Sequence, residues 1–234
     1  MLMDIFSSFD SYEFNSIYFL SNNIILSTMI ILFLAMFTSC WLSNNRMNSL
    51  ILPPLNLMFN QLSRTKSFLI KGYDVIISSL FLMLIMVNLM GMIPFVMSIS
   101  THLIFTLSLG LTLWVSVILS SITLNKKEFI AKLLPDGAPD WLNPFLVLIE
   151  TVSITVRPLT LSFRLAANMS AGHIVLGLLG TYLSVALSTS MTASLILLLI
   201  SSGYILFEFA ICMIQAYIFC LLLSLYTDDH SSNH

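Results

Sequence analysis

The sequence predicts an all-α integral membrane protein. Of its 234 residues, 58% are apolar and only 9% are charged, whereas soluble proteins carry roughly 25% charged residues. Several apolar stretches reach the roughly 20 residues that a helix needs to cross a bilayer core. Because so few charged side chains cannot cover a water-exposed surface, we expect lipid to surround most of the chain.

The charged residues gather in the connections between the apolar stretches. Seven of the nine Lys and Arg residues lie in the segments 46–71 and 126–132, whereas the N-terminal tail and the last ten residues hold acids and no Lys or Arg. An excess of Lys and Arg in short loops marks the side of the membrane on which the chain is made. We therefore expect both basic segments on that inner side and both ends of the chain on the outer side.

The first part of the chain holds single spans of ordinary length. We expect them at residues 24–41, 75–96 and 103–124. The second and third are so close in sequence that they predict an antiparallel hairpin. Between the first two, residues 50–71 combine apolar residues at helical spacing with polar and basic ones, which predicts an amphipathic interfacial helix. An outer tail, 1–17, precedes the first span, and a turn-rich inner loop, 125–140, follows the third.

Two further apolar stretches, 141–179 and 183–226, are too long for one upright span each. At 1.5 Å per residue each reaches roughly 60 Å, about twice the thickness of a bilayer core. Either each stretch breaks into two spans, with Pro158 and Gly203 as possible break points, or each is one long and strongly tilted helix. We expect the bend between the two stretches in the glycine-containing segment 177–181.

Ionisable residues inside these two stretches are candidate functional residues, because burying them in a membrane costs several kcal/mol. Glu150, Arg157 and Arg164 are seven residues apart, so they share one helix face. Glu208 and Gln215 are also seven apart on the next stretch. We expect the two polar faces to meet each other or a common partner. Two more polar residues, on the first of the two stretches, complete the set: Asn168 and His173.

The chemistry of these side chains suggests a path for protons. Buried carboxylates and imidazoles can change protonation state near physiological pH, so Glu150, His173 and Glu208 are candidate relay groups. A guanidinium keeps its proton, so an arginine among them can repel a proton but cannot relay one. The simpler alternative is that the charges pair and hold the helices together.

Three motifs resemble subunit a of F-type ATP synthases, the stationary half of a rotary proton motor. They are LSFRLAANMSAGH at 161–173, FEFAICMIQAY at 207–217 and NLMGMIPF at 88–95. The order of elements is similar over nearly the whole chain. The chain has RLAAN where many bacterial members have RLFGN, and its His173 and Glu208 exchange the acid and histidine typical of bacteria. Both features favour a mitochondrial member.

The resemblance implies a role for each candidate residue. Arg164 matches the essential arginine that faces the rotating ring of c subunits, and Glu150 matches an acid of the inner half-channel. His173 and Glu208 match a pair that lines the outer half-channel. Polar residues around the arginine correspond to Asn168 and Gln215. Two residues remain as secondary candidates: Arg157, which could simply pair with Glu150 or a lipid headgroup, and Asn88, which suits an interhelical hydrogen bond.

The resemblance also implies a location and partners. We expect a multi-pass protein of the mitochondrial inner membrane, with both termini on the intermembrane-space side and the basic loops in the matrix. Its last two segments would form a long tilted hairpin along the c-ring. Expected partners are the c subunits, the peripheral stalk and other membrane subunits, lipid and protons, with no nucleic acid, metal or cofactor. No glycine-rich phosphate loop is present, so we expect a non-catalytic subunit.

Three other functions fit the sequence less well. A secondary transporter usually contains an internal repeat, and the Arg164 region has no second copy. A respiratory-complex subunit that binds haem or quinone would need paired ligands on facing helices, and His102 and His173 have no evident partners. A structural scaffold would not explain the titratable series. The cysteines Cys40, Cys212 and Cys220 form no CxxC pair, and we expect them to pack as small apolar side chains.

Overall fold

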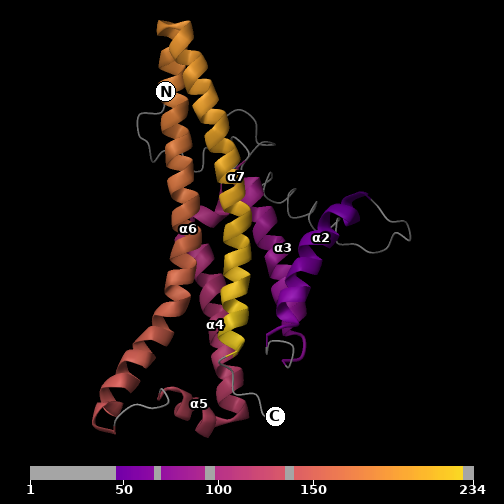
Figure 1. Ribbon diagram of the computed structural model, residues 1–234, viewed down its shortest axis with the longest axis vertical. Coiled ribbons are helices and arrows are strands. Elements are labelled where there is room, and N and C mark those ends of the chain that lie inside the picture. The colour runs from indigo at the N-terminus through magenta and orange to yellow at the C-terminus, as the bar shows by residue number, and fades with distance from the viewer. Residues whose placement is uncertain (1–45, 66–69, 93–97, 135–139, 229–234) are drawn as a thin grey trace, which may run out of the picture.

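The computed structural model describes residues 46–65, 70–92, 98–134 and 140–228, and every regular element in these ranges is a helix (Figure 1). The expected outer tail and first span lie outside the described residues. In chain order the elements are α2 (Arg46–Leu62), α3 (Tyr73–Gly91), η4 (Ile99–Thr101), α4 (Leu103–Leu124), α5 (Lys126–Lys132), η5 (Asp140–Leu142), α6 (Asn143–Thr189) and α7 (Met191–Asp228).

The two longest helices, α6 with 47 residues and α7 with 38, lie side by side as a hairpin (Figure 1). Each long apolar stretch is therefore one continuous helix. Neither Pro158 nor Gly203 ends a helix. Pro158 removes one backbone donor, which commonly bends a helix, and Figure 1 shows the beginning of α6 leaning away from α7.

The turn of the hairpin lies at Ser190, so our expectation of a bend at 177–181 was wrong. Ser190 has extended backbone angles, φ −158° and ψ 137°, and it separates two helices that are otherwise continuous. Ser188 and Thr189 donate their hydroxyls back to the carbonyls of Val185 and Ala186. Such local bonds compete with the backbone hydrogen bonds of the helix. A single glycine, by contrast, lowers helix stability by only about 1 kcal/mol relative to alanine.

Within the described residues, four helices are long and apolar enough to cross a membrane: Tyr73–Gly91, Leu103–Thr123, Asn143–Thr189 and Met191–Thr227. Asn143–Thr189 is the least apolar of the four, and it carries Glu150, Arg157 and Arg164. Pro144 lies in its first turn, where a proline is well tolerated. These properties agree with an all-helical membrane protein.

The core is built where the shorter helices pack against the hairpin. Helix α3 packs against α7, α4 against α6, and α2 against α3. Large, fully buried apolar side chains from α2, α3, α6 and α7 fill this region: Met58, Leu62, Ile77, Leu84, Leu161, Leu165, Phe219 and Leu223. The end of the hairpin that carries the turn extends beyond the other described helices (Figure 1).

Helix α2 is shorter than the amphipathic helix we expected at 50–71. It ends at Leu62, where Ser63 and Thr65 donate their hydroxyls back to backbone carbonyls. Met58 and Leu62 are buried against α3, while Leu57 and other apolar side chains of α2 are exposed. The helix therefore has one face buried against α3 and one exposed face. Its place at the lipid interface stays a prediction.

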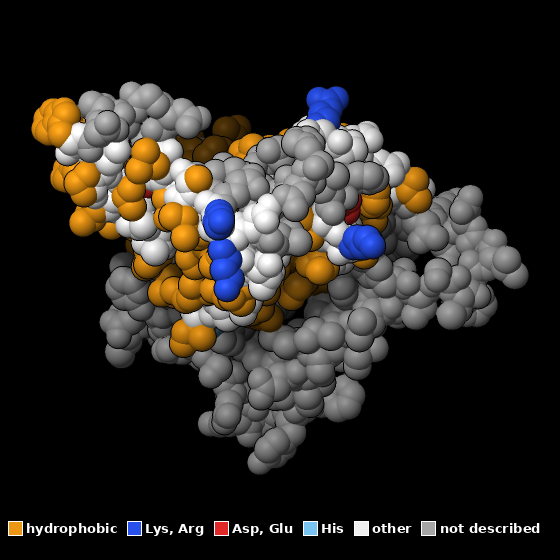
Figure 2. Space-filling view, turned by 90° about the horizontal axis from the view of Figure 1, so that it is seen from below, with side chains coloured by type: hydrophobic (Ala, Val, Ile, Leu, Met, Phe, Trp, Pro, Cys, Tyr) orange, Lys and Arg blue, Asp and Glu red, His pale blue; other side chains and the backbone are white. Residues whose placement is uncertain are grey.

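Basic side chains lie on the end of the molecule opposite the hairpin turn (Figure 2). Helix α4 begins and ends at residues 103 and 124, and the segment after it contains the short helix α5, which follows an extended Asn125 with φ −143°. Figure 2, which views the end opposite the hairpin turn, shows several Lys and Arg side chains on this surface. The side of the membrane that this end faces stays a prediction.

Candidate functional site

All six primary candidate residues lie on the α6–α7 hairpin, at three levels along it. Glu150 lies near the beginning of α6, Arg164 lies 14 residues later and His173 nine residues after that. At 1.5 Å per residue, Glu150 and His173 are about 35 Å apart along the helix. The titratable candidates are therefore separated by about the thickness of a bilayer core, with Arg164 between them.

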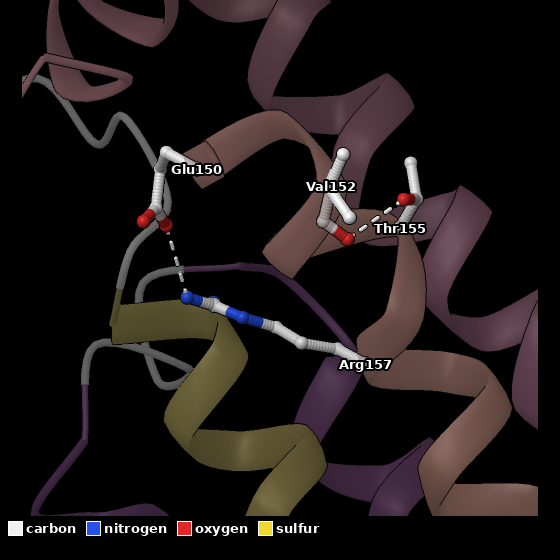
Figure 3. A network of polar contacts seen from close by, with 4 residues as sticks. All are labelled: Glu150, Val152, Thr155 and Arg157. Atoms are coloured by element: carbon white, nitrogen blue, oxygen red, sulfur yellow. Dashed lines mark hydrogen bonds and ion pairs between the residues drawn. The ribbon is translucent and has the colours of Figure 1, made fainter. Parts of the chain in front are cut away.

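The first level joins Glu150, Arg157 and Tyr226. Arg157 Nη2 donates to Glu150 Oε1 at 3.3 Å, and the Arg157 guanidinium carbon lies 5.5 Å from the centre of the Tyr226 ring. Figure 3 shows the arginine reaching back along α6 to the carboxylate. This is the pairing that the spacing of seven residues suggested. The two side chains are 29% and 36% exposed, so we expect the ion pair to contribute less than about 1 kcal/mol.

The second level ties the two long helices together beside Arg164. Asn168 Nδ2 donates to Gln215 Oε1 at 2.8 Å, and Gln215 is only 4% exposed. An interhelical bond of this kind is worth about 0.6 to 2 kcal/mol in a membrane. Arg164 lies one turn before Asn168 and its side chain is exposed. Within the described residues, its guanidinium makes no hydrogen bond or ion pair.

The third level contains Glu208, which is 3% exposed and projects from α7 toward α6. Its carboxylate occupies the space beside Gly172, where an added Cβ would overlap both carboxylate oxygens. Sequence reasoning missed Gly172. Its signal was a small residue next to His173 in a long helix, because small residues allow close approach between membrane helices.

His173 follows Gly172 directly and is half-buried. Its Nε2 atom and Glu208 Oε2 are both buried, and neither has a hydrogen-bond partner in the described part of the chain. Most buried polar atoms in proteins are hydrogen-bonded, and the exceptions often mark functional or hydrated sites. The third level therefore has the chemistry of a site that can exchange protons with water or with another subunit.

Asn88 connects α3 to this part of the hairpin. It is fully buried, and its Nδ2 donates to the backbone carbonyl of Cys212 at 3.4 Å. The structure thus shows the interhelical bond that we expected for Asn88. Cys212 and Cys220 are both buried and have free thiols, as expected for small apolar side chains, while Cys40 lies outside the described residues.

Comparison with known proteins identifies the family. The family model of the ATP synthase A chain matches residues 20–228. The chain is 49% identical to ATP synthase subunit a of Albinaria caerulea over 68% of this chain and 74% of the relative, and 35% identical to that of Mytilus edulis over 99% and 100%. It is 33% identical to ATP synthase F(0) complex subunit a of Rhopalosiphum padi over 98% and 100%. The chain therefore belongs to the family of ATP synthase subunit a, a non-catalytic membrane subunit of the ATP synthase complex.

Proposed function

We propose that this chain is the stator of a rotary proton motor, with two offset half-channels that open against a ring of c subunits and with Arg164 as the gate between them. The observation that carries the proposal is the order of groups along the hairpin. Glu150 lies at one level, and Glu208 and His173 lie at another, about 35 Å away along the helix. An exposed arginine, Arg164, lies between them.

The outer half-channel would use Glu208 and His173. Both groups can hold or release a proton, and they lie on facing helices where Gly172 allows close approach. A proton that reaches them from the outer side passes to a carboxylate on the rotor. Once neutral, that rotor carboxylate can turn into lipid without the large cost of moving a charge there.

The inner half-channel would use Glu150. After the ring has turned, a protonated rotor site meets this level and releases its proton toward the matrix. Arg157 pairs with Glu150 and lies over the Tyr226 ring, which ties this carboxylate to the last turns of α7. Arg157 thus acts here as a positioning residue.

Arg164 would prevent protons from passing directly between the two half-channels. Its guanidinium remains charged, so it repels a free proton and favours the ionised form of a rotor carboxylate that passes it. Its exposed place on α6 leaves it accessible to a group outside this chain. The bond between Asn168 and Gln215 holds the two helices together one turn away.

The length of the hairpin supports a strongly tilted position beside the ring. At 1.5 Å per residue, the 47 residues of α6 and 38 residues of α7 reach roughly 70 Å and 57 Å, about twice a bilayer core. We place this assembly in the mitochondrial inner membrane, with the basic end in the matrix and with the peripheral stalk and other membrane subunits as further partners. Each proton then delivers about 2.3 kcal/mol per 100 mV, so several must pass for each ATP made.

The first test compares proton flux and ATP synthesis in membranes that contain the assembled complex with wild-type chain, Arg164→Ala or Arg164→Lys. We expect both variants to lose coupled synthesis and the passive proton leak to rise most for alanine, because lysine keeps a charge. Arg157→Ala is the matched control on the same helix, and it should leave the membrane proton-tight. If synthesis and tightness survive Arg164→Ala, the gate is wrong and the charges serve to pair helices or to bind a transported solute.

A further inference from the structure

Three sulfur atoms, from α6, α7 and the residue just after α3, meet one turn from Glu208. Cys212 Sγ of α7 lies 3.4 Å from Met92 Sδ, just after α3, and 3.5 Å from Met169 Sδ of α6. Cys212 and Met169 are each 1% exposed. The proton path described above uses none of these three side chains.

The three donors are all soft, which limits the ligands that they can hold. Thiolate and thioether sulfur select Cu(I) and similar soft cations over Mg²⁺, Ca²⁺ or Mn²⁺. The described residues contain no group of three or more His, Cys, Asp or Glu side chains that could hold a metal ion. A soft monovalent cation is therefore the ion whose chemistry fits this cluster.

We propose that Cys212, Met92 and Met169 form a binding site for a soft monovalent cation, Cu(I) or Ag(I). The metal forms a bond to Cys212 Sγ as the Sγ–H bond breaks, the proton leaves to water, and no electron is transferred. The two thioethers complete a three-sulfur shell without changing charge. The site is then electrically neutral, which suits a position within the membrane.

The two contacts that Cys212 Sγ makes need only a small expansion to accept the ion. Metal–sulfur bonds of about 2.3 Å place three sulfurs in a plane about 4.0 Å apart, compared with 3.4 and 3.5 Å here. Methionine side chains have three rotatable bonds and adapt readily to such shifts. The Met169 methyl group already lies 3.3 Å from the position of a Cβ on Gly91, so the absence of a side chain at Gly91 leaves room for the movement.

The position of the cluster would make the ion an inhibitor, a consequence that rests on the proposed proton path. Cys212 is four residues after Glu208 on α7, and Met169 is four residues before His173 on α6, so each is one helical turn from a relay group. Glu208 Oε2 has no partner among the described residues and can add a further donor to the ion. A carboxylate held on a metal is not free to carry a proton.

Cys220 provides a matched control on the same helix. It is a second buried, free thiol, but its contact is with the backbone carbonyl of Ile77 at 3.9 Å, and among the described residues it makes no hydrogen bond to a thioether. A reagent that reacts with any buried thiol would treat Cys212 and Cys220 alike. A three-sulfur site would bind the ion at Cys212 and not at Cys220.

The test titrates the purified, assembled complex with Ag(I), which is not reduced or oxidised during the experiment. We expect Cys212→Ser to bind one silver ion fewer than wild type and Cys220→Ser to retain that high-affinity ion. Met169→Leu keeps the thiol but should weaken the binding at least tenfold. Equal loss in the two serine variants, or unchanged affinity in Met169→Leu, would show that the sulfur contacts are packing only and would overturn the site.

A parallel measurement of ATP-driven proton pumping separates this proposal from the function on which it rests. In wild type and Cys220→Ser, silver should lower the flux at concentrations at least tenfold below those needed for Cys212→Ser. Silver that binds through Cys212 and Met169 but leaves the flux unchanged would keep the metal site and overturn the outer path through Glu208. Assembly of each variant is checked by its ATP synthesis without silver.

Discussion

Gly172 shows how one missing side chain makes room for a buried carboxylate. Glu208 fills the space where a Cβ of residue 172 would lie, and both residues are buried within the hairpin. The carboxylate can therefore reach α6 only if residue 172 is glycine or if the helices separate. No composition or spacing argument revealed this requirement, because it depends on which faces of α6 and α7 meet.

We predict that Gly172→Ala impairs proton transport. Helix propensity alone does not explain this effect. The added methyl group must displace the carboxylate or push α7 away, which costs about 1 to 3 kcal/mol in a packed interior. ATP-driven proton pumping and the thermal stability of the assembled complex would both fall. Gly177→Ala is the control, because an added Cβ there meets nothing within 4 Å. Equal pumping in the two variants would contradict the positioning role.

A second prediction concerns Glu208 itself. Glu208→Gln keeps the length and nearly the volume of the side chain but cannot release a proton. We expect the complex to assemble normally and proton flux to fall by at least tenfold. Glu150→Gln, made in the same way on the opposite level, should also reduce flux while leaving Arg157 without its charged partner. Normal flux in Glu208→Gln would remove that residue from the outer path.

The two long helices depend on a few polar links, because lipid provides little hydrophobic drive between membrane helices. The bond between Asn168 and Gln215 is the clearest of these, and Asn88 adds a link from α3 to α7. Both bonds join residues far apart in sequence. Their loss should therefore separate elements and leave each helix intact.

This link can be measured with a double-mutant cycle. We expect Asn168→Ala and Gln215→Ala each to lower the stability of the detergent-solubilised complex, and the double variant to cost less than the sum of the two. The coupling energy should be about 0.6 to 2 kcal/mol, the range for such bonds in membranes. Additive effects within about 0.5 kcal/mol would mean that the two amides do not interact.

Sequence periodicity predicted the helices better than it predicted their contacts. The bounds of α4 and the pairing of Arg157 with Glu150 followed from hydropathy and from a spacing of seven residues. The turn at Ser190 did not, because glycine in the preceding segment was a more obvious breaker than a run of Ser and Thr. Hydropathy also could not decide whether Pro158 divides α6, since a proline can bend a long helix without ending it. Gly172 and the three-sulfur cluster involve tertiary contacts, which a single sequence does not reveal.

The orientation of the whole molecule is the remaining prediction, and α4 offers a direct way to test it. His102 and Lys126 lie at the two ends of this helix and are both exposed. The 22 residues between its ends reach about 33 Å, close to the thickness of a bilayer core. The two positions should therefore lie on opposite sides of the membrane.

We expect a membrane-impermeant thiol reagent to label Lys126→Cys from the matrix side and His102→Cys from the intermembrane-space side, in complexes whose native cysteines are replaced by serine. The reason is the bias of Lys and Arg toward the side of synthesis, together with the basic side chains on the end of the fold opposite the hairpin turn (Figure 2). Labelling with detergent present shows that both positions are reactive.

Labelling of both from one side would mean that α4 does not cross the bilayer. A reversed pattern would keep the fold and exchange the inner and outer half-channels, so that Glu150 would receive protons and Glu208 would release them.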